Sequence, residues 1–304
     1  MSVWIPDSPC TPETCITAPA ATAGAGRRLA RGCGVLLMIA TGFVLALVAR
    51  RLRADARARV ARAWTRLAVR AIGVRTTVTG DLAGYLAGDS GGVLLVANHI
   101  SWLDPLVLSA ARPCRMVSQH EVSTWPVLGT LVAGAGTIFH RRERLHALPG
   151  TVGRVRDALR AGDAVTVFPE ATTLCGAEPV RFRAAFFQAA VDAGVPVRPI
   201  AVRYRDAYGR PATDPAYIGD DTMAGSLRRV IRARSLVAEV TALPEISPSE
   251  LSGSRHDRRF LARLAQRAVA DELGLSGSGT FPAEAAADRP GGCPIPDNRL
   301  VGAR

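Results

Sequence analysis

The sequence predicts an α/β fold, a mostly parallel sheet flanked by helices, with an N-terminal membrane-associated helical region. Two observations carry this prediction. From residue 73 onward, apolar runs of strand length alternate with helical stretches, an order typical of a parallel sheet that is covered on both faces. Before that point, residues 34–49 form a run of sixteen residues without a charge, and arginines flank the run on both sides.

The alternating pattern and the composition give the expected elements and domain limits. Strands are expected near residues 74–79, 93–97, 115–118, 136–140, 164–168, 197–203 and 236–242, and helices near 105–112, 145–161, 181–193 and 255–273. We expect a disordered N-terminal segment at 1–26, the membrane-associated helical region at 27–72, an α/β domain at 73–274 and a disordered tail at 275–304, because both ends are rich in small residues and proline.

The apolar run at 34–49 favours a membrane. A bilayer-spanning helix needs about 20 apolar residues, so spanning, re-entrant and half-buried arrangements all stay open, as does a buried core helix. The flanking arginines suit lipid head groups, and no small-residue cleavage site follows to indicate a signal peptide. Residues 50–72 are predicted to be helical, and their apolar ridge consists of Val60, Trp64, Leu67 and Ala71. Such a helix lies either on a membrane surface or against the α/β domain.

The chain is strongly basic, with a net charge of +12, and it contains no lysine. This excess favours an anionic partner. Aromatic residues make up 5% of the chain and no metal-finger spacing occurs, so we expect no nucleic acid partner and infer a lipid surface instead. The six cysteines are scattered, without a C-x-x-C pair or a histidine at ligand spacing. We therefore expect neither a metal site nor a disulfide framework.

The first candidate site is the segment NHISWLDP at 98–105, which follows an apolar strand. Ligands bind at the carboxyl ends of strands in open α/β sheets. His99 and Asp104 would diverge by about 140° on a straight helix, so they meet only if the chain bends. Pro105 favours a helix start at this point, with Asp104 as the N-cap. A neutral imidazole could then take a proton from a hydroxyl while the carboxylate fixes its tautomer; alternatively, Asp104 only caps the helix.

Two further segments end predicted strands with polar residues. FPEATT at 168–173 offers Glu170 and Thr172 to a polyol, or backbone N–H groups to an anion; the alternative is an ordinary turn. GTIFHRR at 136–142 ends in Arg141 and Arg142, whose guanidinium groups suit a phosphate or a carboxylate; the alternative is a solvated charge pair.

Taken in chain order, the segments resemble the conserved blocks of the glycerolipid acyltransferase family, which includes bacterial 1-acyl-glycerol-3-phosphate acyltransferases. NHISWLD is similar to the family motif N-H-x-x-x-x-D. The I-F-x-x-R, F-P-E-G-T and V-P-V-x-P blocks match residues 138–142, 168–172 and 195–199. The resemblance covers residues 73–245 or so, and it implies that the domain at 73–274 is an acyltransferase domain.

The resemblance also implies roles for individual residues. His99 is expected to act as the base and Asp104 to orient it, while Arg142, Glu170 and Thr172 bind the acceptor. The donor is expected to be acyl-CoA or acyl-carrier protein, without a further cofactor or a metal. The family works at the cytoplasmic membrane, which implies a catalytic domain on the cytoplasmic face.

Three positions depart from the family pattern. Ala171 replaces a glycine, and alanine disfavours a positive φ. Thr173 stands where many members carry a basic or small polar residue, and His140 replaces an apolar one. The segment from Phe168 to Tyr204 resembles a branch that includes lyso-ornithine-lipid acyltransferases.

These observations favour an enzyme that acylates the free hydroxyl of 1-acyl-glycerol-3-phosphate to give phosphatidate. The first alternative is the same chemistry on another lysolipid, such as lyso-ornithine lipid. The second is a membrane-binding protein with a decayed site. A hydrolase would place water at His99, but the sequence contains no G-x-S-x-G elbow to support one.

Overall fold

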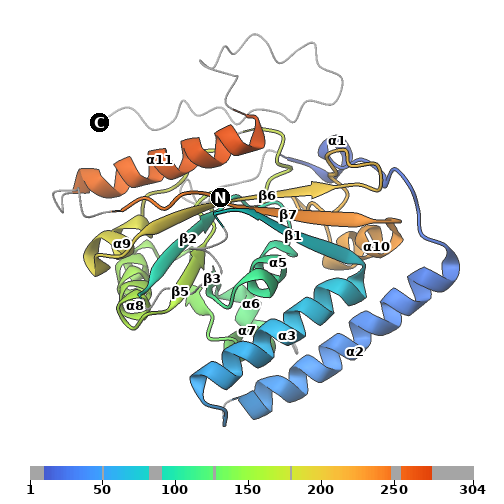
Figure 1. Ribbon diagram of the computed structural model, residues 1–304, viewed down its shortest axis with the longest axis horizontal. Helices are drawn as coiled ribbons and strands as arrows, with labels where there is room; N and C mark the ends of the chain where they lie inside the picture. Colours follow the sequence, from blue (N-terminus) through green and yellow to red (C-terminus); the bar gives the residue numbers. More distant parts are fainter. Residues whose placement is uncertain are drawn as a thin grey trace.

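The computed structural model of the protein is built on one twisted sheet (Figure 1). It describes residues 10–49, 51–81, 91–125, 128–178, 180–247 and 255–275. Within these residues the sheet has seven strands in the order β1-β7-β6-β2-β5-β3-β4. The strands are β1 (Val74–Gly80), β2 (Val93–Ala97), β3 (Arg115–Gln119), β4 (Ile138–His140), β5 (Ala164–Val167), β6 (Val197–Arg205) and β7 (Leu236–Ala242). All neighbouring strands are parallel except β6 and β7, which confirms the predicted mostly parallel sheet.

Helices cover both faces of this sheet. One face carries α3 (Ala54–Ile72), α5 (Asp104–Ala111) and α10 (Met223–Arg232), and the other carries α8 (Leu148–Arg160), α9 (Phe187–Ala193) and α11 (Arg255–Leu273). All five residues of the central strand β2 are buried. Leu95 and Ala97 belong to the first core and Leu94 and Val96 to the second, because successive side chains of a strand point to opposite faces. This two-sided burial explains the unbroken apolar run before His99.

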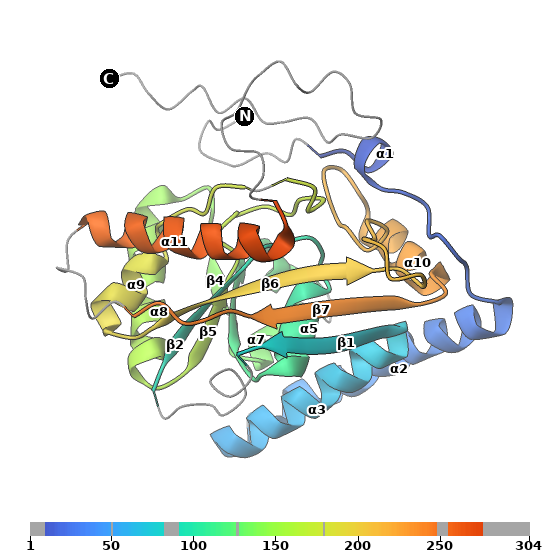
Figure 2. The ribbon, with the colours of Figure 1, turned by 45° about the horizontal axis from the view of Figure 1, so that its top comes forward.

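The N-terminal region forms a helical pair along the β1 edge of the sheet, where α2 (Ala25–Ala49) lies beside α3 (Figures 1 and 2). In the described part of the chain, residues Ala25–Val48 form the one helix that is long and apolar enough to cross a membrane, and little of it is buried. The helix is longer than the charge-free run because it continues N-terminally through three arginines. It therefore leaves a long apolar surface outside the core.

Helix α3 packs against the α/β domain. Val69 and Ile72 are buried in the core, and two arginines bind the carbonyls that end α5: Arg62 Nη2 donates to Ala111 O at 2.7 Å, and Arg66 Nε donates to Ala110 O at 2.9 Å. Carbonyls at a helix C-terminus lack partners within the helix. Of the two arrangements expected for residues 50–72, the structure shows the packed one. The predicted ridge is divided, since Trp64 Nε1 donates to Thr41 of α2 at 3.3 Å while Leu67 is exposed.

The predicted helix at 181–193 is wrong in its first half, because only Phe187–Ala193 is helical. The Phe182 N–H donates to Gln266 Oε1 at 3.0 Å and the Arg183 N–H to Pro169 O at 2.9 Å. These bonds to other segments replace the helical ones. Among the described residues of the α/β domain, the helices without a predicted counterpart are α6 (Glu121–Thr124), α7 (Leu128–Gly134) and α10.

Residues 10–24, which the composition places in a disordered segment, follow the body of the protein instead. They contain the short helix α1 (Pro12–Cys15), and Thr22 forms an antiparallel bridge with Ala233. The Thr17 N–H donates to Thr213 Oγ1 at 2.9 Å. Residues 1–9, and residues 276–304 of the predicted tail, lie outside the described residues.

Candidate active site

The two polar segments expected to form the site end neighbouring strands. His99 follows β2 and Glu170 follows β5, and these strands pair in parallel. Carboxyl ends of paired parallel strands meet at the same edge of a sheet, which is where ligands bind in such folds. The topology thus brings together two segments that are far apart in the sequence.

His99 and Asp104 are in direct contact. His99 Nδ1 lies 2.8 Å from Asp104 Oδ2, and the same carboxylate oxygen accepts the N–H groups of Ile100 at 2.7 Å and Ser101 at 2.8 Å. Asp104 is completely buried. The loop therefore wraps around the carboxylate, and this is the bend that two residues five positions apart need in order to meet.

The predicted capping role of Asp104 is wrong. The helix begins at Asp104 itself, and its N-terminus has no side-chain cap. Both carboxylate oxygens are taken by other groups, since Oδ2 binds the loop and Oδ1 accepts a hydrogen bond from Tyr204 at 2.6 Å. Asp104 serves the histidine and its loop, while Pro105 in the first turn favours the helix start.

Tyr204 is a site residue that the sequence analysis missed. Burial, followed by the adjacent Asp104 carboxylate, raises the pKa of its hydroxyl well above the ordinary value, so the hydroxyl stays a donor. Residues Ile200, Val202 and Tyr204 alternate along β6 and belong to the core beneath α5. The sequence shows this alternation, but it does not show that β6 is the strand that pairs with β2.

Asn98 has a supporting role in the same place. Its Nδ2 donates to Val202 O at 2.9 Å, and its Oδ1 accepts the Val202 N–H at 2.8 Å. The side chain thus binds both backbone groups of one residue in β6. This fixes the end of β2 next to the strand that carries Tyr204.

The His99 ring is oriented for proton transfer. It stacks on Phe168 with ring centroids 4.0 Å apart. A carboxylate on Nδ1 accepts the proton carried there, so the lone pair of the neutral ring is on Nε2. No hydrogen bond occupies Nε2 within the described residues, and 19% of the side chain is exposed. Nε2 is therefore the atom that can accept a proton from a substrate.

Glu170 joins its loop to the histidine. Its Oε2 accepts the His99 N–H at 2.8 Å, and in the opposite direction the Leu174 N–H donates to His99 O at 2.9 Å. Burial raises the pKa of Glu170 to about 8, the His99 N–H opposes this shift, and Asp104 and Cys10 add to it. At neutral pH, most Glu170 side chains are therefore protonated. Thr172 is half-buried on the same loop, within two residues of Glu170.

Ala171 adopts the conformation that the family glycine would favour. Its φ is 62°, and it is the one non-glycine residue with a positive φ in the described chain. Left-handed backbone costs an alanine roughly 1–2 kcal/mol. The departure from the family motif is therefore also a source of strain, placed between two expected acceptor-binding residues.

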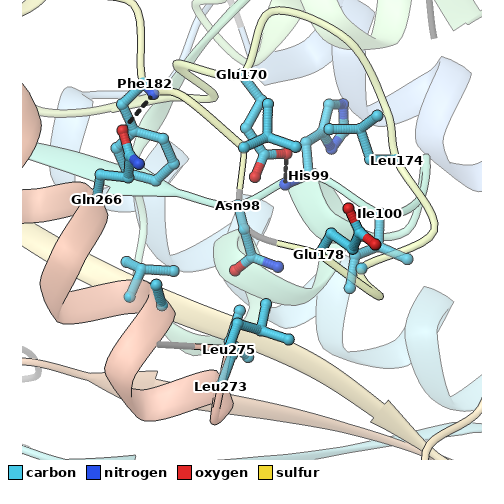
Figure 3. A pocket seen from close by; sticks show the side chains of 14 residues that line it. Asn98, His99, Ile100, Glu170, Leu174, Glu178, Phe182, Gln266, Leu273 and Leu275 are labelled. Atoms are coloured by element: carbon cyan, nitrogen blue, oxygen red, sulfur yellow. Dashed lines mark hydrogen bonds between the residues drawn. The ribbon is translucent and has the colours of Figure 1, made fainter. Parts of the chain in front are cut away.

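A pocket opens beside His99 and Glu170, and Figure 3 shows both residues in its wall. The opposite wall is largely apolar, with Gln266 as a polar member, and comes from the last turns of α11 and from Leu275. Glu178, an exposed residue that the sequence analysis did not select, also lines the pocket. No arginine lines it among the described residues. The site therefore combines a basic nitrogen, two carboxyl groups and an apolar wall.

Arg142 is not part of this pocket. It follows β4, which is three strands away from β2, and at about 4.8 Å per strand the separation is roughly 14 Å. With its amide oxygen toward Arg142, Gln119 accepts hydrogen bonds from both terminal nitrogens at 2.8 and 2.9 Å. Burial lowers the pKa of Arg142, while the nearby Glu121 carboxylate raises it. The structure thus brings His99, Asp104 and Glu170 together, with Thr172 on the same loop as Glu170, and it holds Arg142 at the other end of the strand edge.

The sequence is similar to those of known acyltransferases. The family model described as Acyltransferase matches residues 75–203. A lyso-ornithine lipid O-acyltransferase from Rhodobacter capsulatus is 30% identical over 288 residues, covering 90% of this chain and 97% of that protein. A 1-acyl-sn-glycerol-3-phosphate acyltransferase from Neisseria gonorrhoeae is 38% identical over 149 residues, and the matched part covers 49% of this chain and 58% of that relative.

The fold has a solved counterpart as well. The crystal structure of the 1-acyl-sn-glycerophosphate acyltransferase from Thermotoga maritima superimposes with a TM-score of 0.54 at 18% identity, over 82% of this chain and 100% of that one. Its similarity supports the fold alone. With the full-length similarity to the Rhodobacter protein and the matching family model, the chain belongs to the glycerolipid acyltransferase family.

Proposed function

We propose that the protein transfers a fatty acyl group from a thioester donor, acyl-CoA or acyl-carrier protein, to the free hydroxyl of a lysolipid. The observation that carries the proposal is the His99–Asp104 pair: Nε2 has no hydrogen-bond partner among the described residues, and His99 lines a pocket with one largely apolar wall. An apolar wall suits an acyl chain, and a buried carboxylate on the far ring nitrogen suits a histidine base.

The proposed reaction follows from these positions. Nε2 of His99 takes the proton of the lysolipid hydroxyl as its oxygen attacks the thioester carbonyl carbon. Asp104 stabilises the imidazolium that forms, and Tyr204 keeps the carboxylate in place. When the tetrahedral intermediate collapses, the carbon–sulfur bond breaks and the imidazolium returns the proton to the leaving thiolate.

The first proposed acceptor is 1-acyl-glycerol-3-phosphate. Arg142 supports it, because a half-buried guanidinium near the strand edge can bind a phosphate through two hydrogen bonds. Because β4 lies three strand spacings from β2, roughly 14 Å, the Arg142 side chain must extend along the strand edge to bind the phosphate of a lysolipid whose hydroxyl lies at His99.

The second proposed acceptor is lyso-ornithine lipid. The pocket beside His99 contains the exposed carboxyl group of Glu178 and no arginine among the described residues, and such a lining suits an ammonium group better than a phosphate. The full-length similarity to the Rhodobacter enzyme points the same way.

A panel assay tests the function and the acceptor together. Purified protein is given a labelled acyl donor with each lysolipid alone, and then with both lysolipids competing for limiting donor. We expect transfer by the unchanged protein and none by His99→Ala. If phosphatidate forms preferentially and Arg142→Lys weakens that reaction alone, the first acceptor holds; if the ornithine lipid is preferred and Arg142→Ala leaves its rate unchanged, the second holds. Release of free fatty acid alone would indicate a hydrolase. The absence of any reaction would indicate a non-catalytic protein.

We also propose that α2 anchors the protein in the cytoplasmic membrane, with the catalytic domain on the cytoplasmic face. Several large apolar residues of α2 are exposed, among them Leu36, Val44 and Leu47. Replacing these three by glutamine should move much of the protein to the soluble fraction, whereas Phe260→Gln, at an exposed position of α11, serves as the control. An unchanged membrane fraction for the triple variant would contradict the proposed anchor.

A further inference from the structure

Three cysteines that are scattered in the sequence meet in the folded chain. The sulfur atoms of Cys10, Cys15 and Cys175 all lie within 4.8 Å of one another, and all three residues are buried. Cys10 lies just before the short helix α1 and Cys15 is its last residue, whereas Cys175 comes from the loop that carries Glu170 and Thr172. We propose that these sulfurs bind one thiophilic cation, with Zn²⁺ as the preferred occupant.

The distances fit such an ion. Zn–S bonds are about 2.3 Å long, so two sulfurs of a tetrahedral zinc site are separated by roughly 3.8 Å. The sulfurs need to approach by at most about 1 Å to reach that geometry. Thiolates are the ligands that select zinc or monovalent copper over harder cations. Three protein ligands leave the fourth position of a zinc ion to a solvent molecule.

The backbone around the sulfurs is held on both sides. The Cys15 N–H donates to Thr11 O at 3.1 Å and thereby closes the turn between the first two cysteines. A Cβ placed on Gly219 would lie 2.8 Å from Cys10 O, so the N-terminal segment sits directly on the 217–221 loop. On the other side, Gly176 has a φ of 78°, and a Cβ there would lie 3.0 Å from Ile100 Cδ1. Both segments are therefore placed before any ion binds.

A cluster of ordinary buried thiols is the alternative, because cysteine also acts as a small apolar residue. A disulfide is a second alternative, but it joins two sulfurs and leaves the third buried beside it. A cation uses all three at once. It would also link the segment leading into α2 to the loop that carries Glu170, a role that does not depend on the transfer reaction.

Metal analysis of the full-length protein tests the proposal. The protein is purified under reducing conditions without chelator, and zinc and copper are measured by mass spectrometry in the unchanged protein, in Cys10→Ser and Cys175→Ser, and in the control Cys114→Ser. Cys114 is outside the cluster. We expect about one metal ion per chain in the unchanged protein and the control, and a loss of at least about tenfold in both cluster variants, because each lacks one ligand.

Spectroscopy on the unchanged protein covers the case in which a cluster variant does not fold. After reconstitution with Co²⁺, thiolate-to-cobalt absorption and X-ray absorption with three sulfur neighbours would support the site, and copper in place of zinc would support the same ligand set with another ion. Four outcomes would overturn the proposal: substoichiometric metal after reconstitution, a spectrum without sulfur ligands, a disulfide between two of these cysteines under reducing conditions, or equal metal loss in Cys114→Ser.

Discussion

Replacing Ala171 by glycine should stabilise the protein relative to a matched control, even though the same change normally destabilises. The strain at φ 62° amounts to roughly 1–2 kcal/mol for an L-residue with a side chain. Glycine removes this strain but gives the unfolded chain more freedom, which costs about 0.4–1 kcal/mol. The net change at Ala171 is therefore between about 0 and 1.6 kcal/mol in favour of the variant.

A control in the same loop isolates the strain. Ala177 is exposed and its φ is not positive, so Ala177→Gly should lose about 0.4–1 kcal/mol through the unfolded state alone. The difference between the two variants equals the strain, roughly 1–2 kcal/mol. Thermal unfolding in detergent, followed by circular dichroism, resolves this difference, because 1 kcal/mol shifts the Tm of a chain of this size by about 2–4 °C.

An equal loss of stability in Ala171→Gly and Ala177→Gly would show that Ala171 is not strained. The same preparations serve for the transfer assay. The Glu170–His99 hydrogen bond is already formed at 2.8 Å with alanine in place, so the unchanged protein should be active. Activity that appears only in Ala171→Gly would instead support the alternative of a decayed site.

Three further changes test the site. Asp104→Asn should lower kcat by roughly 10²–10⁴ in the transfer assay, because the amide cannot stabilise the imidazolium; a rate close to that of the unchanged protein would argue against the pair. Tyr204→Phe removes a hydrogen bond to a buried carboxylate, so we expect about 1.5–3 kcal/mol less unfolding free energy. The acidic limb of the pH–rate profile of this variant should also move to higher pH, because Asp104 becomes a stronger hydrogen-bond acceptor for His99 once Tyr204 no longer donates to it. An unmoved limb would show that Tyr204 has a structural role alone. Glu170→Gln should be increasingly stable relative to the unchanged protein between pH 4.5 and about 8, because over this window the unfolded carboxyl ionises while the folded one does not; a pH-independent difference would contradict the raised pKa.

The sequence predicted the central pair because its geometry is local. An apolar strand, a five-residue spacing and a proline leave few ways for the loop between His99 and Asp104 to run. The role of Asp104 was less predictable, because a carboxylate before a proline suits a helix cap equally well. The structure decides this point through Tyr204, which reaches the carboxylate from a strand about 100 residues away. A contact at that separation depends on strand order, which the sequence pattern does not reveal.

The same limit explains the two remaining differences. Motif matching selected Arg142 together with Glu170, but it could not show that β5 lies next to β2 while β4 lies three strands away. Spacing rules likewise discounted the cysteines, because Cys175 lies far from Cys10 and Cys15 in the sequence and meets them only in the folded chain. Both differences concern which segments become neighbours, whereas the secondary structure within each segment was largely predictable.

The loop from Phe168 to Gly176 shows why these distant contacts matter together. Backbone strain such as that at Ala171 persists only where the surroundings over-determine the conformation. The loop is fixed before the strained residue by the stacking of Phe168 on His99, and after it by the hydrogen bond from Leu174 to His99 O. Glu170 adds a third connection to the same histidine. Because these contacts converge on His99, the base is held against the loop that carries Glu170 and Thr172. A change in this loop should therefore alter acceptor choice and proton transfer together.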